Sequence, residues 1–217
     1  MKLGIVIQTN SEWGSLRKKC MATWEAHAER KGYEINVVDF TELNDSFAEI
    51  LLAELISNDF DYVGCNFDDL FFSEFYIPEA NSLGMCAAQS KVDYFRTDGR
   101  APGTGNPIFT VDGIEFLEIK TTTYKFSTVL GFFSKDILKK MISQGVRSAW
   151  DIERHMDSCV CVAPATKTVS YENILVKGDL DLLAVYFSRL HIGLIASLKR
   201  LGYRKITSVY RKLRVYI

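Results

Sequence analysis

The sequence predicts an α/β protein with a mostly parallel, mixed sheet flanked by helices, followed by a basic helical tail. Short β-branched runs alternate with helical patterns through the first third of the chain, as in βαβ units with right-handed crossovers. The 217 residues are 47% hydrophobic, which suffices for one folded domain and excludes a disordered chain. All acidic residues precede position 182, so the charge of the last segment differs from that of the rest of the chain.

Residues 1–67 carry five expected elements in the order βαβαβ. These are a strand at Leu3–Gln8, a helix at Ser15–Lys31, a strand at Tyr33–Phe40, a helix ending near Ser57 and a strand at Asp61–Phe67. The first strand is an apolar run, as expected of a strand buried on both faces. Gly32 is a typical residue after a helix end. Asn44 or Asp45 is expected to cap the second helix.

The remainder of the first 181 residues is less regular. Met85–Ala88 is expected to be a strand, and Arg96–Pro107 consists of turn-forming residues. Asp112-Gly113 predicts a two-residue hairpin turn. Ser134 is expected to cap a helix. The other expected elements are a strand at Leu130–Phe133, that capped helix to about Ser143, a helix at Ala149–Met156 and strands at Val160–Val162 and Val169–Val176.

Charge divides the chain into an expected domain at residues 1–181 and a tail at 182–217. The tail has eight basic residues and no acidic ones, whereas residues 1–181 have 18 basic and 27 acidic ones. Apolar residues recur at helical spacing between the basic ones, which predicts amphipathic helices that dock on an anionic membrane surface. The alternative is that the tail packs on the acidic domain. Nucleic acid is not an expected partner, because the rest of the chain would repel it.

Cysteine usage and hydropathy indicate a cytoplasmic protein, with peripheral attachment at the inner face of the membrane through the tail. The five cysteines show no zinc-type spacing, which favours a reducing compartment. Cys159 and Cys161 are expected to face one side of a strand and pack in the core. No apolar run approaches the roughly 20 residues of a membrane span. The N-terminal residues MKLGIVIQTN are expected to form the first strand rather than a signal peptide.

Two adjacent carboxylates, Asp68 and Asp69, directly follow the third expected strand. Ligands of parallel sheets bind beyond the carboxyl ends of the strands, so this pair faces the expected cleft. Adjacent carboxylates can hold a divalent cation, which in turn can neutralise a diphosphate. The alternative is that both are turn residues.

The stretch DYVGCNFDDLFF resembles the strand and acidic motif of GT-A glycosyltransferases, which have the nucleotide-diphospho-sugar transferase fold. Three later segments match bacterial surface-polysaccharide transferases of this type in the same order: YKFSTVLGFFSKDILKKMI, SAWDIERHM and VSYENILVKGDL. The resemblance covers about residues 1–180. It implies a GT-A, Rossmann-like fold and an enzyme that moves a sugar from a nucleotide-diphosphate-sugar donor to a glycan or glycolipid acceptor in surface-polysaccharide biosynthesis.

The resemblance also implies a donor site at the ends of the first and third strands. Thr9 and Asn10 would meet the nucleoside, and Asn66, Asp68 and Asp69 the rest of the donor. Asp68 and Asp69 would hold Mn²⁺ or Mg²⁺. The usual Asp-x-Asp signature is replaced by Asn66-Phe67-Asp68 or by the Asp68-Asp69 pair; asparagine can bond a ribose but brings no charge to a metal. A cation is still expected, because a leaving diphosphate needs its charge neutralised.

The segment Trp150-Asp151-Ile152-Glu153 supplies the candidate catalytic base. An inverting glycosyl transfer needs a carboxylate that deprotonates the acceptor hydroxyl, and the resemblance makes Glu153 the first choice and Asp151 the second. The alternative is that both are acidic residues in the first turn of a helix. His155 could add a metal ligand, although a lone histidine is more often structural.

Three basic residues, Lys91, Arg96 and Arg100, could meet the diphosphate, but solvent-exposed loop charges are the favoured interpretation. Two other functions stay open. A metal-dependent phosphoryl hydrolase could use the Asp68-Asp69 pair, although Gln8-Thr9-Asn10 supplies no nucleophilic aspartate at the first strand. A non-catalytic sugar-nucleotide-binding or scaffold protein would explain the imperfect acidic motif.

Overall fold

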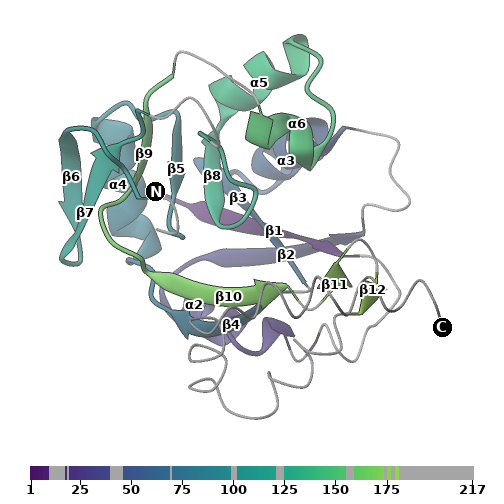
Figure 1. Cartoon of the computed structure of the whole chain (residues 1–217). Coiled ribbons are helices and arrows are strands. Elements are labelled where there is room, and N and C mark those ends of the chain that lie inside the picture. Colours follow the sequence, from purple (N-terminus) through teal and green to yellow (C-terminus); the bar gives the residue numbers. More distant parts are fainter. Residues whose placement is uncertain are drawn as a thin grey trace, which may run out of the picture.

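The protein is built on one eight-stranded mixed sheet (Figure 1). The computed structural model describes residues 1–9, 18, 20–39, 46–68, 70–98, 102–120, 125–154, 159–173, 175–176 and 179–180. In this part of the chain the strands lie in the order β2 (Glu34–Asp39), β1 (Leu3–Thr9), β3 (Tyr62–Phe67), β8 (Gly131–Ser134), β5 (Tyr94–Arg96), β9 (Cys161–Pro164), β7 (Ile114–Glu118) and β6 (Pro107–Val111).

Two small strand pairs accompany the sheet in the described residues. β4 (Leu70–Phe75) pairs antiparallel with β10 (Val169–Asn173), and β11 (Leu175–Val176) with β12 (Asp179–Leu180). The described helices are α2 (Glu25–Arg30), α3 (Phe47–Ser57), α4 (Ala80–Gln89), α5 (Lys135–Ser143) and α6 (Ala149–Arg154). The predicted mixed α/β fold is confirmed.

The three strands of the predicted βαβαβ unit form one side of the sheet. β1 is parallel to β2, with Ile5 opposite Ile35, and parallel to β3, with Ile5 opposite Gly64. β8 then enters antiparallel to both β3 and β5, and β9 is parallel to β5. The strands β1, β2, β3, β5 and β9 therefore all run in one direction, and their carboxyl ends share one edge of the sheet.

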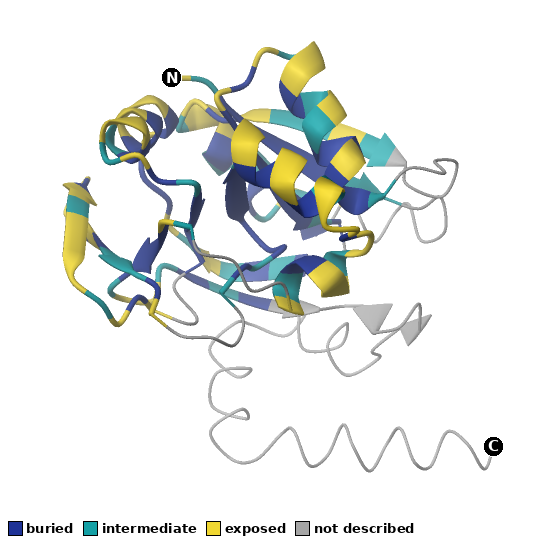
Figure 2. Cartoon of the chain, turned by 90° about the horizontal axis from the view of Figure 1, so that it is seen from above, coloured by how far each residue is buried: buried dark blue, intermediate teal, exposed yellow. Residues whose placement is uncertain are grey.

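Each face of the sheet has its own apolar core, because alternate residues of a strand point to opposite faces. Ile5 and Phe132 pack on the face covered by α2, α4 and the β4–β10 pair. Val6 and Phe133 pack on the other face, which α3, α5 and α6 cover. Figure 2 shows the consequence: the central strands are buried, and the helices expose their outer sides.

The N-terminus of α3 corrects one prediction. Ser46 is the cap: its Oγ accepts a hydrogen bond from the Glu49 N–H, and the Glu49 carboxylate accepts one from the Ser46 N–H. Asn44 and Asp45, the expected caps, lie outside the described residues. Ser46 is favoured because a glutamate three residues later completes a capping box.

Two other predictions were wrong or incomplete. Residues 85–88 belong to helix α4, which buries Ala80, Leu83 and Ala87 at helical spacing. Residues 70–75, not expected to be a strand, form β4. Its partner β10 lies about a hundred positions later, with Val169 opposite Phe75, and no local pattern reveals such a partner.

Several local predictions are confirmed. Asp112 and Gly113 have φ angles of 51° and 77°, as a type I′ turn requires at both central positions, and they join β6 to β7. Ser134 caps α5 through a hydrogen bond that its Oγ accepts from the Ile137 N–H. β1 begins at Leu3, as expected of the N-terminal segment.

The side chains of Cys159 and Cys161 agree with the sequence-based expectation that they face one side. None of the five cysteines, all of which the structure describes, forms a disulfide, and the sulfur atoms of Cys159 and Cys161 lie 3.1 Å apart, so both side chains face the same way. Among the residues described, no helix has the length and apolar character needed to cross a membrane. The tail at residues 182–217 lies outside the described residues.

Candidate functional site

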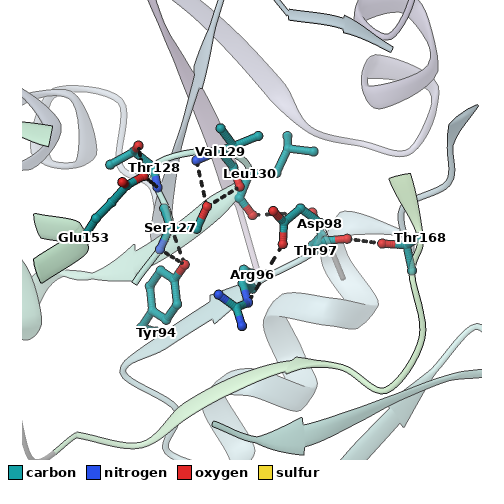
Figure 3. Close-up of polar contacts among 10 residues, drawn as sticks. All are labelled: Tyr94, Arg96, Thr97, Asp98, Ser127, Thr128, Val129, Leu130, Glu153 and Thr168. Atoms are coloured by element: carbon teal, nitrogen blue, oxygen red, sulfur yellow. Dashed lines mark hydrogen bonds and ion pairs between the residues drawn. The ribbon is translucent and has the colours of Figure 1, made fainter. Parts of the chain in front are cut away.

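The candidate site lies at the edge of the sheet where β1, β3 and β5 end and β8 begins. Gly131, the first residue of β8, lies opposite Cys65 of β3 on one side and Arg96 of β5 on the other. The residues that follow β3 and β5 therefore flank the turn that leads into β8. Polar side chains gather around this turn (Figure 3).

Asn66 has the most unusual environment of these residues. Its side chain is 0% exposed, yet neither its Oδ1 nor its Nδ2 has a hydrogen-bond partner among the described residues. A buried polar group without a partner costs about 1–3 kcal/mol, and proteins rarely retain one without a reason. An amide at the carboxyl end of a central strand is well placed to bond a ligand.

Asp68 follows Asn66 by two positions at the end of β3, and Thr9 is the last residue of the neighbouring strand β1. Asp68 follows β3 and is 5% exposed. Gln8 of β1 is opposite Phe67 of β3, so Thr9 and Asp68 are the next residues of adjacent parallel strands. The structure thus brings together three of the residues predicted to bind the donor. Asn10 and Asp69 lie outside the described residues.

A buried ion pair lies across β8 from Asn66. The Arg96 Nε is 3.9 Å from the Asp98 Oδ1, and both residues are about 3% exposed. The chain between them is held at its backbone, because the Thr97 N–H donates to the Leu130 carbonyl at 3.0 Å and the Thr168 hydroxyl donates to the Thr97 carbonyl. Figure 3 shows this segment beside the turn that precedes β8.

The burial of Arg96 overturns the favoured interpretation of this residue. It is not a solvated loop charge but the last residue of β5, whereas Lys91 is exposed as expected. Arg100 lies outside the described residues. The sequence did not predict this burial, because turn-forming residues follow Arg96 and the two strands that pair with β5 come from residues more than thirty positions away. The buried Asp98 likewise had no signal in the sequence.

Glu153 of α6 reaches the same turn. Its Oε1 accepts hydrogen bonds from the Thr128 hydroxyl at 2.9 Å and from the Thr128 N–H at 3.5 Å. The Thr128 carbonyl accepts a bond from the Cys65 thiol at 2.9 Å, and Cys65 is the neighbour of Asn66 in β3. Burial, with the nearby Glu153 charge, raises the pKa of the Cys65 thiol well above its usual value, so this cysteine stays protonated. The half-buried carboxylate of Glu153 is therefore linked to the strand that carries Asn66.

Asp151 has a different position. Its carboxylate accepts hydrogen bonds from the backbone N–H groups of Ser148 and Arg147, and its own N–H donates to the Ser148 hydroxyl. The bonds from Ser148 lower the pKa of this exposed carboxyl below its usual value. This arrangement is a capping box at the start of α6. Asp151 therefore has the helix-start role that was the alternative to catalysis for this segment.

The metal prediction depends mainly on residues outside the described part. Asp69 and His155 both lie there, and the described residues include no cluster of three His, Cys, Asp or Glu side chains able to hold a metal. Asp68 is a buried carboxylate, the kind of hard oxygen ligand that Mg²⁺ and Mn²⁺ prefer. The one described ligand therefore fits such an ion.

Comparisons with known proteins give structural likenesses only. No family model matches the chain, and no curated protein matches it. The solved structure of A197 from STIV has a TM-score of 0.46 and 12% identity, over 81% of this chain and 87% of that one. S. aureus TarS in complex with UDP-GlcNAc has a TM-score of 0.42 and 11% identity, over 83% of this chain and 60% of that one.

A glycosyltransferase involved in glycosylation of the PBCV-1 major capsid has a TM-score of 0.36 and 10% identity, over 66% of this chain and 65% of that one. The chain thus corresponds to less than two thirds of the TarS and PBCV-1 proteins. At these identities and TM-scores the likenesses carry no conclusion about activity, which has to come from the site itself.

Proposed function

We propose that this protein is a glycosyltransferase that moves a sugar from a nucleotide-diphosphate-sugar donor to a glycan or glycolipid acceptor in surface-polysaccharide biosynthesis. One observation carries the proposal: the buried amide of Asn66 lacks a protein partner among the described residues, beside the buried Asp68 at the carboxyl end of β3. A ligand with donor and acceptor groups, such as a nucleoside ribose, would satisfy both atoms of the amide. The resemblance of DYVGCNFDDLFF to the GT-A acidic motif supports the same site.

The donor would lie across the ends of β1 and β3. Thr9 and Asn10 would contact the nucleoside, and Asn66 the ribose. Asp68 and Asp69 would hold Mg²⁺ or Mn²⁺, which neutralises the diphosphate charge when bound. His155 remains a further candidate ligand for that ion.

Glu153 would serve as the base of an inverting transfer. Its carboxylate takes the proton from the acceptor hydroxyl, the acceptor oxygen forms a bond to the anomeric carbon, and the bond from that carbon to the diphosphate oxygen breaks. The nucleoside diphosphate leaves with the bonding electron pair. Asp151 remains the second candidate, although its bonds to Ser148 give it a capping role.

Thermal shift of the full chain with UDP-, GDP- and dTDP-sugars, with and without Mn²⁺, tests the donor site. We expect one donor class to raise the melting temperature and Asp69→Ala to abolish that rise while the protein stays folded. A protein that no nucleotide sugar stabilises would overturn the proposal.

Release of nucleoside diphosphate tests the chemistry. Glu153→Gln keeps the shape of the side chain and removes the base, so we expect about a 100- to 10,000-fold loss of rate with the thermal shift retained. Glu115→Gln, an exposed site on the β6–β7 hairpin, is the matched control and should leave the rate unchanged. Donor binding without any turnover would instead favour the non-catalytic alternative.

We also propose that residues 182–217 place the enzyme on an anionic membrane surface. The support is the charge of this segment, with eight basic and no acidic residues, because each basic residue near an anionic leaflet contributes about 1 kcal/mol. Co-sedimentation with phosphatidylserine or phosphatidylglycerol vesicles at low salt checks this. Equal behaviour of the full chain and a chain ending at Asp181 would contradict it.

A further inference from the structure

The turn Ser127–Leu130 connects the candidate base to the sheet. Thr128 is 2% exposed, and its side chain and backbone N–H both donate to the Oε1 of Glu153. Among the described residues, Thr128 is the one hydrogen-bond partner of this carboxylate. Figure 3 shows the contact at the side of the turn away from Arg96 and Asp98.

The turn itself is held from several directions. The Tyr94 hydroxyl accepts a hydrogen bond from the Ser127 N–H at 2.7 Å and donates to the Ser127 carbonyl at 3.1 Å. The Ser127 hydroxyl accepts from the Val129 N–H at 3.2 Å. The Leu130 N–H donates to the Cys65 carbonyl at 2.8 Å. These bonds join the turn to both β5 and β3.

Two backbone features show that the surrounding contacts impose a backbone conformation on this turn that its residues do not favour by themselves. Leu130 has a φ of 50°, a left-handed conformation that is costly for a bulky residue and persists only where the surroundings impose it. A Cβ on the next residue, Gly131, would lie 2.0 Å from the Ser127 carbonyl oxygen, so this close approach requires glycine. Strained segments of this kind concentrate at functional sites.

We propose that Thr128 is a positioning residue that orients the Glu153 carboxylate toward the acceptor hydroxyl; this inference rests on the proposed role of Glu153 as the base. The bonds to Oε1 hold one oxygen of the carboxylate in place, and they leave Oε2 to take the proton. A carboxylate on a half-buried side chain would otherwise sample several rotamers. Misplacement of a reacting group by about 1 Å can cost about 100-fold in rate.

Thr128→Val tests the inference because it keeps the shape and removes the hydroxyl. We expect kcat for donor turnover to fall about 10- to 100-fold with the donor KM unchanged, and Thr128→Ser to restore most of the rate. Thr23→Val is the matched control. Its hydroxyl makes two hydrogen bonds, to the Cys20 carbonyl and from the Phe72 N–H, and neither involves Glu153 or Thr128. We expect it to lower stability and leave kcat unchanged.

The double variant separates positioning from a general structural role. If Thr128 acts through the Glu153 carboxylate, Thr128→Val should cause no further loss of rate in the Glu153→Gln background. An equal loss in both backgrounds would overturn the inference and leave the proposed function standing. An inactive wild-type protein would count against the proposed function instead.

A crystal structure of the Thr128→Val variant gives a readout that does not depend on turnover. We expect the Glu153 side chain to leave its position beside residue 128 and adopt another rotamer. A carboxylate that stays in place would overturn the positioning role, whatever the activity of the wild-type protein.

Discussion

Replacing Asn66 by leucine should stabilise the ligand-free protein and abolish donor binding. The side chains are similar in length and branching, so the main change is removal of two amide atoms that are buried without partners among the described residues. Such an unsatisfied group costs about 1–3 kcal/mol. The free energy of unfolding should rise by about that amount, which corresponds to roughly 2–4 °C in melting temperature per kcal/mol for a domain of this size.

Asn58→Leu is the matched control, because it makes the same substitution where the amide is bonded. The Asn58 Nδ2 donates to the Glu54 carbonyl at 3.0 Å and to its carboxylate at 3.1 Å. Losing these bonds at the end of α3 should destabilise the protein by about 1 kcal/mol. The two variants should therefore shift stability in opposite directions.

Chemical denaturation of the ligand-free proteins measures the stability changes, and thermal shift with the stabilising nucleotide sugar measures binding. We expect Asn66→Leu to show higher stability and no donor-induced shift, and Asn58→Leu to show lower stability and a normal shift. If Asn66→Leu lowers stability as Asn58→Leu does, the Asn66 amide has a partner in the free protein, and the assignment of this residue to a ligand would be refuted.

Three further predictions concern Gly131 at the start of β8, the cap of α3 and the buried Tyr62. Gly131→Ala should cost about 1–3 kcal/mol in urea denaturation, because the new Cβ would lie 2.0 Å from the Ser127 carbonyl oxygen; unchanged stability would mean that the turn can relax. Ser46→Ala should cost about 1 kcal/mol by loss of the α3 cap with an unaltered donor-induced shift, and an altered shift would contradict its purely local role. Burial raises the pKa of Tyr62 from 10.0 to about 12, and its hydroxyl donates to the Val92 carbonyl. Between those two pH values the unfolded chain therefore binds fewer protons than the folded one, and stability falls as pH rises. Tyr62→Phe should flatten this fall in urea denaturation at a series of pH values, and an unchanged slope would show that Tyr62 does not cause it.

Local signals in the sequence were sufficient for much of the fold. Some features depend only on residues within a few positions of one another, namely the apolar run at β1, the Ser134 cap and the Asp112-Gly113 turn. A short stretch of sequence is therefore enough to predict each of them. The βαβαβ order then followed from the alternation of such stretches. Local reasoning likewise indicated the Asp68-Asp69 pair, because two carboxylates directly after a buried strand are visible without knowledge of its neighbours, whereas Asn66 was indicated only by the resemblance to the GT-A motif.

Contacts between distant segments decided what local patterns could not show. Arg96 is buried because β8 and β9, far along the chain, pair with its strand. Glu153 bonds Thr128 across 25 positions, whereas Asp151, two residues earlier on the same short helix, caps that helix instead. Both glutamate and aspartate suit the first turn of a helix, so composition alone could not tell which carboxylate bonds the turn before β8 and which caps the helix. Only the packing of α6 against the turn before β8 distinguishes them, because that packing determines which carboxylate meets the edge of the sheet.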